Sequence, residues 1–118
     1  MDKEEVIGAL AALAQSTRLD AFRLIVAAEP EGLPAGEIAR RLAVPHNTLS
    51  THLAVLARAG LVEGDRRSQS IFYRARLEDF RNVASYLLKD CCGGRPEICA
   101  SVVSDLTPRR SPKEKAHG

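Results

Sequence analysis

The most constraining feature of this chain is the stretch VPHNTLSTHLAVLARAGLV at residues 44–62. Leu49, Leu53 and Leu56 recur at helical spacing, so one side of a helix here should be buried. The opposite side carries short groups and no carboxylate: His46, Asn47, Ser50, Thr51 and Ala54. Such a face can reach base edges and phosphates in a DNA major groove without repelling them. An ordinary amphipathic helix with a polar outer side fits the same pattern. The neighbouring segments are therefore needed to distinguish a DNA-binding helix from an ordinary one.

The segments before this helix predict a helix-turn-helix. We expect helices over residues 2–14, 17–28 and 35–42, with Ser16 as the N-cap of the second. In the first helix, Val6, Leu10, Leu13 and Ala14 form an apolar stripe that could pack on its own domain or on a partner subunit. Two short helices joined by a tight turn, the second with a polar face, are typical of a DNA-binding helix-turn-helix.

After Gly60 the pattern changes to that of a hairpin. We expect strands over residues 61–65 and 69–75, the second rich in aromatic and β-branched side chains. The junction carries Arg66 and Arg67, which would contact the DNA backbone if the hairpin is the wing of a winged helix. A surface hairpin whose basic tip only serves solubility is the alternative.

A last helix is predicted over residues 77–90, with a broad apolar face. Together with the first helix it is the expected interface of a homodimer. The predicted fold class is therefore mainly α with a small β-hairpin, a winged helix-turn-helix that forms a homodimer. We expect a DNA-binding and dimerisation domain over residues 1–92, a C-terminal loop over 93–105 and a disordered tail over 106–118.

Charge and composition exclude several functional classes. Residues 37–76 hold seven arginines and three acidic residues, within a chain of net charge +2, which favours a nucleic-acid surface in its middle. No run reaches the roughly 18 apolar residues of a membrane span, and residues 1–5 do not resemble a signal peptide, so we expect a cytoplasmic protein without a membrane partner. The sequence shows no phosphate-binding glycine loop, no paired carboxylates in a plausible cleft, and no cysteine–histidine pair that this layout brings together, so we expect neither an enzyme nor a catalytic cofactor.

The order of these elements resembles the ArsR/SmtB winged-helix metalloregulators over about residues 3–90. STRL at residues 16–19, TLSTHL at 48–53 and AGLV at 59–62 carry the resemblance. It implies a homodimeric repressor that leaves double-stranded operator DNA when a toxic metal or metalloid binds. It also implies that the residues contacting DNA are His46, Asn47, Thr48, Ser50 and Thr51, with Arg66 and Arg67 on the wing. His52 occupies the family's His-Leu position, and for it a packing role and a phosphate-contacting role are both open.

The three cysteines of the chain, Cys91, Cys92 and Cys99, lie within nine residues. The third helix lacks the thiol motif of well-known arsenic repressors, and the last helix lacks the histidines of zinc sensors. Three thiolates without a nitrogen or oxygen ligand suit a soft, three-coordinate metalloid better than tetrahedral zinc. This arrangement resembles arsenic repressors with an adjacent thiol pair and a third cysteine after the last helix. As(III) or Sb(III) is therefore the expected inducer.

The predicted function is a transcriptional repressor that responds to arsenite or antimonite and dissociates from DNA when three thiolates bind the metalloid. Three alternatives stay open. Cys91 and Cys92 alone would bind a monomethylated arsenical, because it needs only two thiols. Cys99 pairing with either of them would make a redox switch. A constitutive DNA-binding module with inert thiols is the third.

Overall fold

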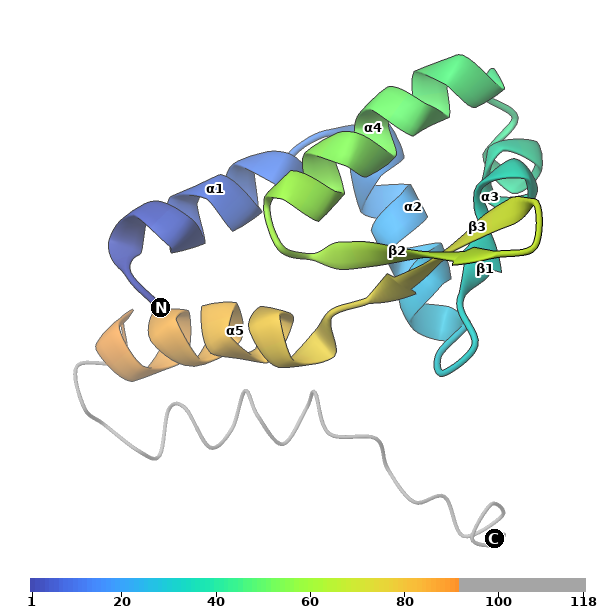
Figure 1. Ribbon diagram of the computed structural model, residues 1–118. Coiled ribbons are helices and arrows are strands. Elements are labelled where there is room, and N and C mark those ends of the chain that lie inside the picture. The colour runs from blue at the N-terminus through green and yellow to red at the C-terminus, as the bar shows by residue number, and fades with distance from the viewer. Residues whose placement is uncertain (92–118) are drawn as a thin grey trace, which may run out of the picture. The chain divides into compact units, whose positions relative to one another are not determined.

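The computed structural model describes residues 1–91. Its elements, in order, are α1 (Lys3–Leu13), α2 (Ser16–Ala27), β1 (Leu33–Pro34), α3 (Ala35–Leu42), α4 (His46–Arg58), β2 (Val62–Arg67), β3 (Ser70–Ala75) and α5 (Leu77–Cys91) (Figure 1). The chain divides into two compact units, Met1–Ala84 and Ser85–Gly118. The predicted loop over residues 93–105 and tail over 106–118 lie outside the described residues. None of the helices formed by residues 1–91 has the length and hydrophobicity that a membrane-spanning segment requires.

Helix α4 packs on the rest of the first unit through its leucine stripe. Leu49, Leu53 and Leu56 are completely buried, as the sequence predicts. The helix packs against α1, α2, α3 and β2, so its apolar stripe is covered from several directions. The rest of this core comes mainly from Ala21, Phe22, Ile25, Ile38, Leu61, Val62 and Val83. The mainly helical fold with a small antiparallel sheet confirms the predicted fold class.

Two left-handed residues redirect the chain, one after each of the two helices of the helix-turn-helix. At the end of α4, Gly60 has φ +81°, its N–H donates to Ala57 O at 3.0 Å, and the Leu61 N–H donates to Leu56 O at 3.0 Å. These two bonds form a Schellman cap. At the end of α3, Ala43 has φ 56°, and the Val44 N–H closes the matching bond to Ala39 O at 3.1 Å. The two caps therefore turn the chain from α3 into α4 and from α4 into β2.

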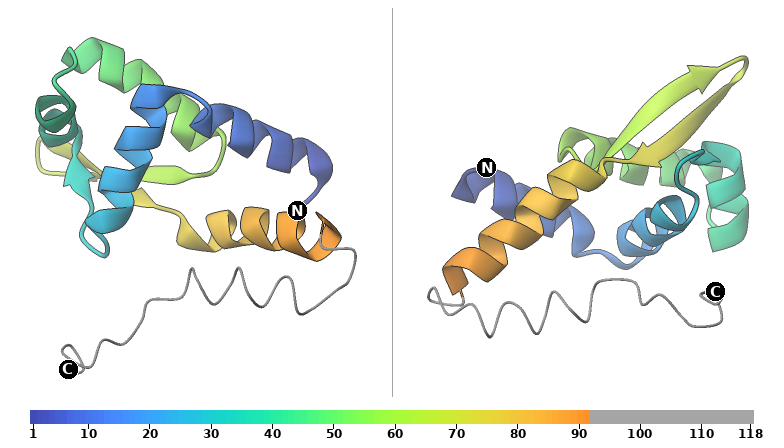
Figure 2. Two further views of the ribbon diagram at one scale, coloured as in Figure 1. Left: turned by 180° about the vertical axis from the view of Figure 1, so that it is seen from behind. Right: turned by 90° about the horizontal axis from the view of Figure 1, so that it is seen from below.

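The sheet has three antiparallel strands in the order β1-β3-β2. Strands β2 and β3 form a hairpin that projects from the helices (Figure 2). Arg67 pairs with Ser70, so the loop is only two residues long, with Ser68 at φ 58°. The predicted first strand stops at residue 65, and β1 is absent from the prediction. Neither feature has an apolar alternation that a sequence could show. The outer part of β2 is exposed and does not alternate, and β1 is only two residues long.

Helix α1 packs through smaller residues than the sequence predicts. Its buried residues are Val6, Ala9 and Ala12, whereas Leu10 is 40% exposed and Ile7 is 50% exposed. Alanines allow α1 to approach α2 and α4 closely, and the larger side chains of Ile7 and Leu10 point away from this contact. Of the predicted apolar stripe, Val6 is buried and Leu13 half-buried against this chain, whereas Leu10 and Ala14 are exposed.

The N-cap of α2 also differs from the prediction. Gln15 Oε1 accepts the Arg18 N–H at 2.8 Å, so Gln15 is the cap and Ser16 is the first residue of the helix.

We expect two glycine-to-alanine substitutions to change stability in opposite directions. Gly60→Ala should lower the free energy of unfolding by about 1 kcal/mol or more, because an L-residue is strained at this positive φ. Gly36→Ala is the matched control: Gly36 lies in α3 with open space around its Cα, and alanine should raise the free energy of unfolding by about 0.5–1 kcal/mol. Urea denaturation at fixed protein concentration measures both, and equal shifts in the same direction would contradict the assigned caps.

Candidate nucleic-acid interface

The exposed face of α4 carries most of the residues that the sequence predicts to contact DNA. His46, Asn47, Thr48, Ser50 and Thr51 are all exposed on this helix. The helix contains no acidic residue, and its last turn carries Arg58. The side chains on this face are therefore short and polar, and none of them would repel a phosphate.

The N-terminus of α4 has no side-chain cap. Pro45 is its N-cap and has no side-chain donor or acceptor to offer. The Leu49 N–H donates to Pro45 O at 3.0 Å, and the Thr48 N–H donates to Asn47 Oδ1 at 2.9 Å. Within the described part of the chain, no acceptor satisfies the N–H groups of His46 and Asn47. Unpaired N–H groups and the positive end of the helix dipole favour an anion at this end of α4.

His52 lies apart from the other predicted residues. It is half-buried, and its Nδ1 is 3.4 Å from Nη1 of Arg18 on α2. Arg18 Nε also donates to Ala12 O at 2.6 Å, so this arginine connects α1, α2 and α4. Sequence reasoning missed Arg18, because the pairing joins residues 34 apart in the chain. The geometry supports the packing role for His52.

The two wing arginines have different environments. Arg67 Nε is 3.0 Å from Asp65 Oδ2, its Nη2 donates to Glu31 O at 3.3 Å, and its guanidinium lies 4.5 Å from the Phe72 ring centre. Arg66 is exposed and has no ion pair among residues 1–91. Consecutive side chains on a strand point to opposite faces. Arg67 is therefore anchored to the hairpin, and Arg66 is the arginine free to meet a phosphate.

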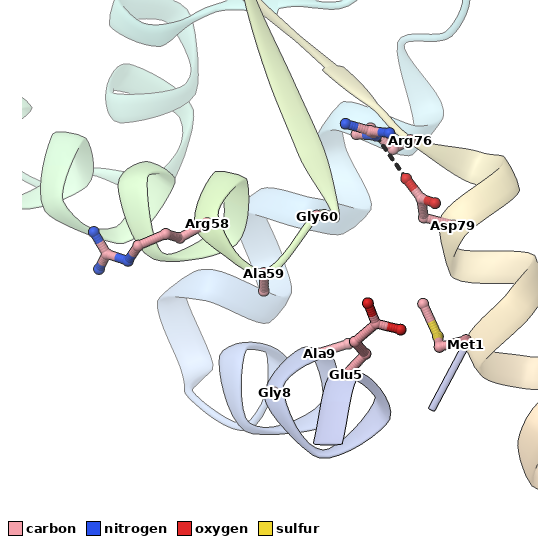
Figure 3. Close-up of a pocket in the computed structure, with 9 residues that line it drawn as sticks. All are labelled: Met1, Glu5, Gly8, Ala9, Arg58, Ala59, Gly60, Arg76 and Asp79. Atoms are coloured by element: carbon pink, nitrogen blue, oxygen red, sulfur yellow. Dashed lines mark ion pairs between the residues drawn. The ribbon is translucent and has the colours of Figure 1, made fainter. Parts of the chain in front are cut away.

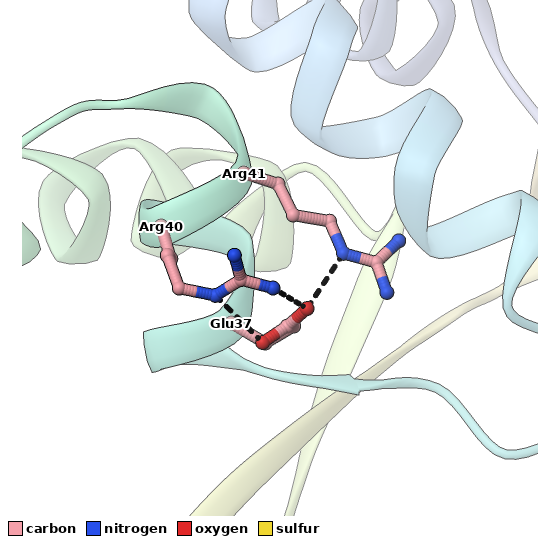
Figure 4. Close-up of polar contacts among 3 residues, drawn as sticks. All are labelled: Glu37, Arg40 and Arg41. Carbon is pink, nitrogen blue, oxygen red and sulfur yellow. Dashed lines mark hydrogen bonds and ion pairs between the residues drawn. The ribbon is translucent and has the colours of Figure 1, made fainter.

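Helix α3 carries a compact charged cluster (Figure 4). Glu37 binds Arg40 through both carboxylate oxygens and accepts from Arg41 Nε at 2.7 Å. Hydrogen bonds from Arg40, and then from Arg41, lower the pKa of Glu37 from its usual 4.5 to about 2. One carboxylate therefore holds two exposed guanidinium groups on the first helix of the helix-turn-helix.

A pocket of about 330 Å³ lies where α1, the end of α4 and the start of α5 meet (Figure 3). Its charged residues include Glu5, and Arg76 with Nε 2.6 Å from Asp79 Oδ2. The Arg58 side chain points away from this ion pair (Figure 3). Charges of both signs line the pocket, so its lining favours neither an anionic nor a cationic ligand.

The predicted thiol site falls largely outside the described residues. Cys91 is the last residue of α5, and Cys92 and Cys99 follow it beyond the described range. Residues 1–91 contain no group of three histidine, cysteine or acidic side chains placed to hold a metal ion.

We expect acid to remove the stability that the Glu37 cluster supplies. Because the folded-state pKa is lowered, this contribution is present above the unfolded-state pKa near 4.5 and is lost as pH falls toward about 2. Glu37→Gln should therefore lower the free energy of unfolding at pH 7, and its difference from wild type should shrink through that window. Urea denaturation at several pH values measures this. Glu63→Gln is the matched control, since Glu63 is exposed and has no ion pair among the described residues. A pH-independent effect of Glu37→Gln on the free energy of unfolding would contradict the stabilising role of the cluster.

Comparison with known proteins adds to this geometry. Residues 13–65 match a protein family described as a helix-turn-helix domain. No curated protein matches the chain. An ArsR-like transcriptional regulator from Rhodococcus sp. RHA1 is similar in structure, with 25% sequence identity, a TM-score of 0.66, and coverage of 88% of this chain and 93% of that chain.

Two further solved structures are similar. HlyU from Vibrio cholerae has 30% identity and a TM-score of 0.59, covering 77% of this chain and 99% of that chain. The homodimeric winged helix-turn-helix domain Mb0332 from Mycobacterium bovis, a possible ArsR-family regulator, has 29% identity and a TM-score of 0.58, covering 74% and 84%. These similarities extend over the helices and the hairpin together. The chain belongs to the ArsR family of winged-helix, DNA-binding transcriptional regulators.

Proposed function

We propose that this protein is a homodimeric transcriptional repressor that binds operator DNA and leaves it when As(III) or Sb(III) binds. The observation that carries the DNA-binding part is the exposed, carboxylate-free face of α4 beside an uncapped helix N-terminus. In a major groove, this face brings hydroxyl, amide and imidazole groups to base edges. The open N–H groups at its start meet a phosphate.

Asn47 is the residue best placed to read a base. Its Oδ1 accepts the Thr48 N–H, which holds the side chain at the first turn of α4 and leaves its amide N–H groups to donate. Thr51 Oγ1 donates to Asn47 O at 3.3 Å, so the hydroxyl of Thr51 offers lone pairs outward. The free guanidinium of Arg66 extends the contact to the DNA backbone beyond the recognition helix.

The homodimer is proposed from the surface of α1 and from the homodimeric relative Mb0332. Met1, Ile7 and Leu10 are between 40% and 50% exposed, while the same helix packs inward through alanines. A second copy would cover this apolar side, with the last helix contributing as well. Two recognition helices then enter successive major grooves about 34–36 Å apart.

The inducer site is proposed from the sequence, with Cys91, Cys92 and Cys99 as thiolate ligands of the metalloid. Cys91 ends α5, so a ligand that joins it to the later cysteines acts directly on a helix of the proposed dimer interface. A coupling free energy of about 1–3 kcal/mol between inducer and DNA is typical and would lower operator occupancy.

We expect Asn47→Ala to weaken binding to a selected operator by about 1–3 kcal/mol, because a base contact is lost. Binding to a random duplex should be unchanged, since phosphate contacts dominate there. Fluorescence anisotropy with both duplexes measures the two affinities. Equal losses on both duplexes would contradict a base-reading role for Asn47.

We expect arsenite to release the reduced full-length protein from DNA at about one equivalent per protomer, with zinc inert. Cys99→Ser should keep DNA affinity and lose the response to arsenite, because the third thiolate is absent. Ser101→Ala, in the same segment, is the matched control. Release of Cys99→Ser at the wild-type arsenite concentration would contradict the three-thiolate site. Release only by methylarsenite would assign the site to Cys91 and Cys92, and release only on mild oxidation would make the protein a redox switch.

A further inference from the structure

A groove of about 380 Å³ lies between α1 and the C-terminal half of α4, on the flank of the proposed DNA-reading face. Gly8, Ala11 and Ala12 of α1 line one side, and their small side chains leave the groove open. Its charged lining residues are Arg18 of α2 and Arg58 of α4, with no carboxylate among the lining residues. The charged residues that line this groove are therefore all positive, whereas the neighbouring pocket, which shares Gly8, Arg58 and Ala59 with it, is lined by charges of both signs.

The Arg18 guanidinium is held in place without being neutralised. Its Nε donates to Ala12 O at 2.6 Å, and its Nη1 lies 3.4 Å from His52 Nδ1. Neither partner is a carboxylate. No carboxylate of residues 1–91 lies within ion-pair distance of Arg18. A half-buried cation without a counter-ion attracts an anion from outside the protein.

Arg58 continues the DNA-facing row of α4. It follows Asn47 by eleven residues and Thr51 by seven, spacings that place all three on one side of a helix. Arg58 is exposed, and its side chain points away from the Arg76–Asp79 pair (Figure 3). The described part of the chain offers it no ion-pair partner. Arg58 therefore stands where the DNA-facing row meets the positive groove.

We propose that this groove binds one backbone phosphate of the operator, with Arg58 as the contact residue and Arg18 supplying a second fixed positive charge. The inference rests on the proposed function and deepens it. When the first turns of α4 are in the major groove, the strand that borders the groove passes along the flank of the helix. Guanidinium groups suit this ligand, because their planar donors match the oxygens of a phosphate. The DNA-contacting surface then extends from α4 and the hairpin to the α1–α4 groove.

The first experiment uses the full-length protein and a duplex selected from a random pool by the wild-type protein. Binding is measured by anisotropy across a range of salt concentrations. Arg58→Ala should reduce the slope of log K against log salt by about 0.9, the value for one lost phosphate contact. Its affinity should fall by a similar factor on the selected and on a random duplex. Arg58→Lys should restore the slope because it keeps the charge.

Arg23→Ala is the matched control, since Arg23 is an exposed arginine of α2 outside the groove and without an ion pair among residues 1–91. It should leave the salt slope unchanged. If Arg58→Ala matches Arg23→Ala in slope and affinity, the proposal is wrong. If the wild-type protein selects no duplex at all, the proposed function fails instead, so the two failures are distinguishable.

A second experiment locates the phosphate. Single methylphosphonates, which remove one negative charge, are placed in turn along each strand of the selected duplex. One position in each half-site should weaken binding of wild type but not of Arg58→Ala. If every position affects both proteins equally, no phosphate is bound by Arg58. If inorganic phosphate binds wild type better than Arg58→Ala while the DNA slopes agree, the groove takes a free anion and the DNA proposal is overturned.

Discussion

Burial of the leucine stripe of α4 is the constraint on which the rest of the first unit depends. Leu49, Leu53 and Leu56 are fully buried against other helices and β2. Each buried leucine contributes roughly 1.5–3 kcal/mol relative to an exposed one, so rotating α4 about its axis would cost several kcal/mol. The same packing fixes the opposite face outward. The orientation of the polar face is therefore a consequence of the core.

Local backbone features and a few polar contacts then set where the other parts of the interface lie. The left-handed residues Ala43 and Gly60 fix how the chain enters and leaves α4, and the second of them directs it into the hairpin. Arg67 is tied to the hairpin and Arg66 is left free. Arg18 connects the end of α1 to His52 on the side of α4, so the proposed dimerisation helix and recognition helix share one contact. The proposed DNA-facing surface of α4 is thus held by contacts at its ends and along its side.

Elements with a strong apolar period could be predicted from the sequence. The α4 stripe and its exposed face follow from the spacing of leucines, and α3 was expected at the same bounds that the structure gives, Ala35–Leu42. Elements without such a period were less predictable. Arg66 and Arg67, the last two residues of β2, were predicted to lie in the loop, and β1 exists only because Leu33 and Pro34 pair with β3. In α1, alanines face inward because close helix packing outweighs side-chain size, and no spacing rule shows this.

The residues of the candidate site also differ in how well the sequence predicts them. The residues on the exposed face of α4 were predictable because a helix places them by spacing alone. The roles of His52 and Arg67 depend on partners distant in sequence, Arg18 and Glu31, which only the folded chain brings near. The sequence pattern assigns Arg58 no role, and its place beside a positive groove becomes visible only when α1 is packed against α4.

The most direct test of the central claim is nuclear magnetic resonance of the isotope-labelled, reduced full-length protein bound to a selected duplex. Intermolecular nuclear Overhauser effects report which side chains lie against major-groove protons. The account predicts such effects from Asn47, Ser50 and Thr51, and none from Ile7 or Leu10 on α1. Effects concentrated on α1, with the exposed face of α4 silent, would contradict it.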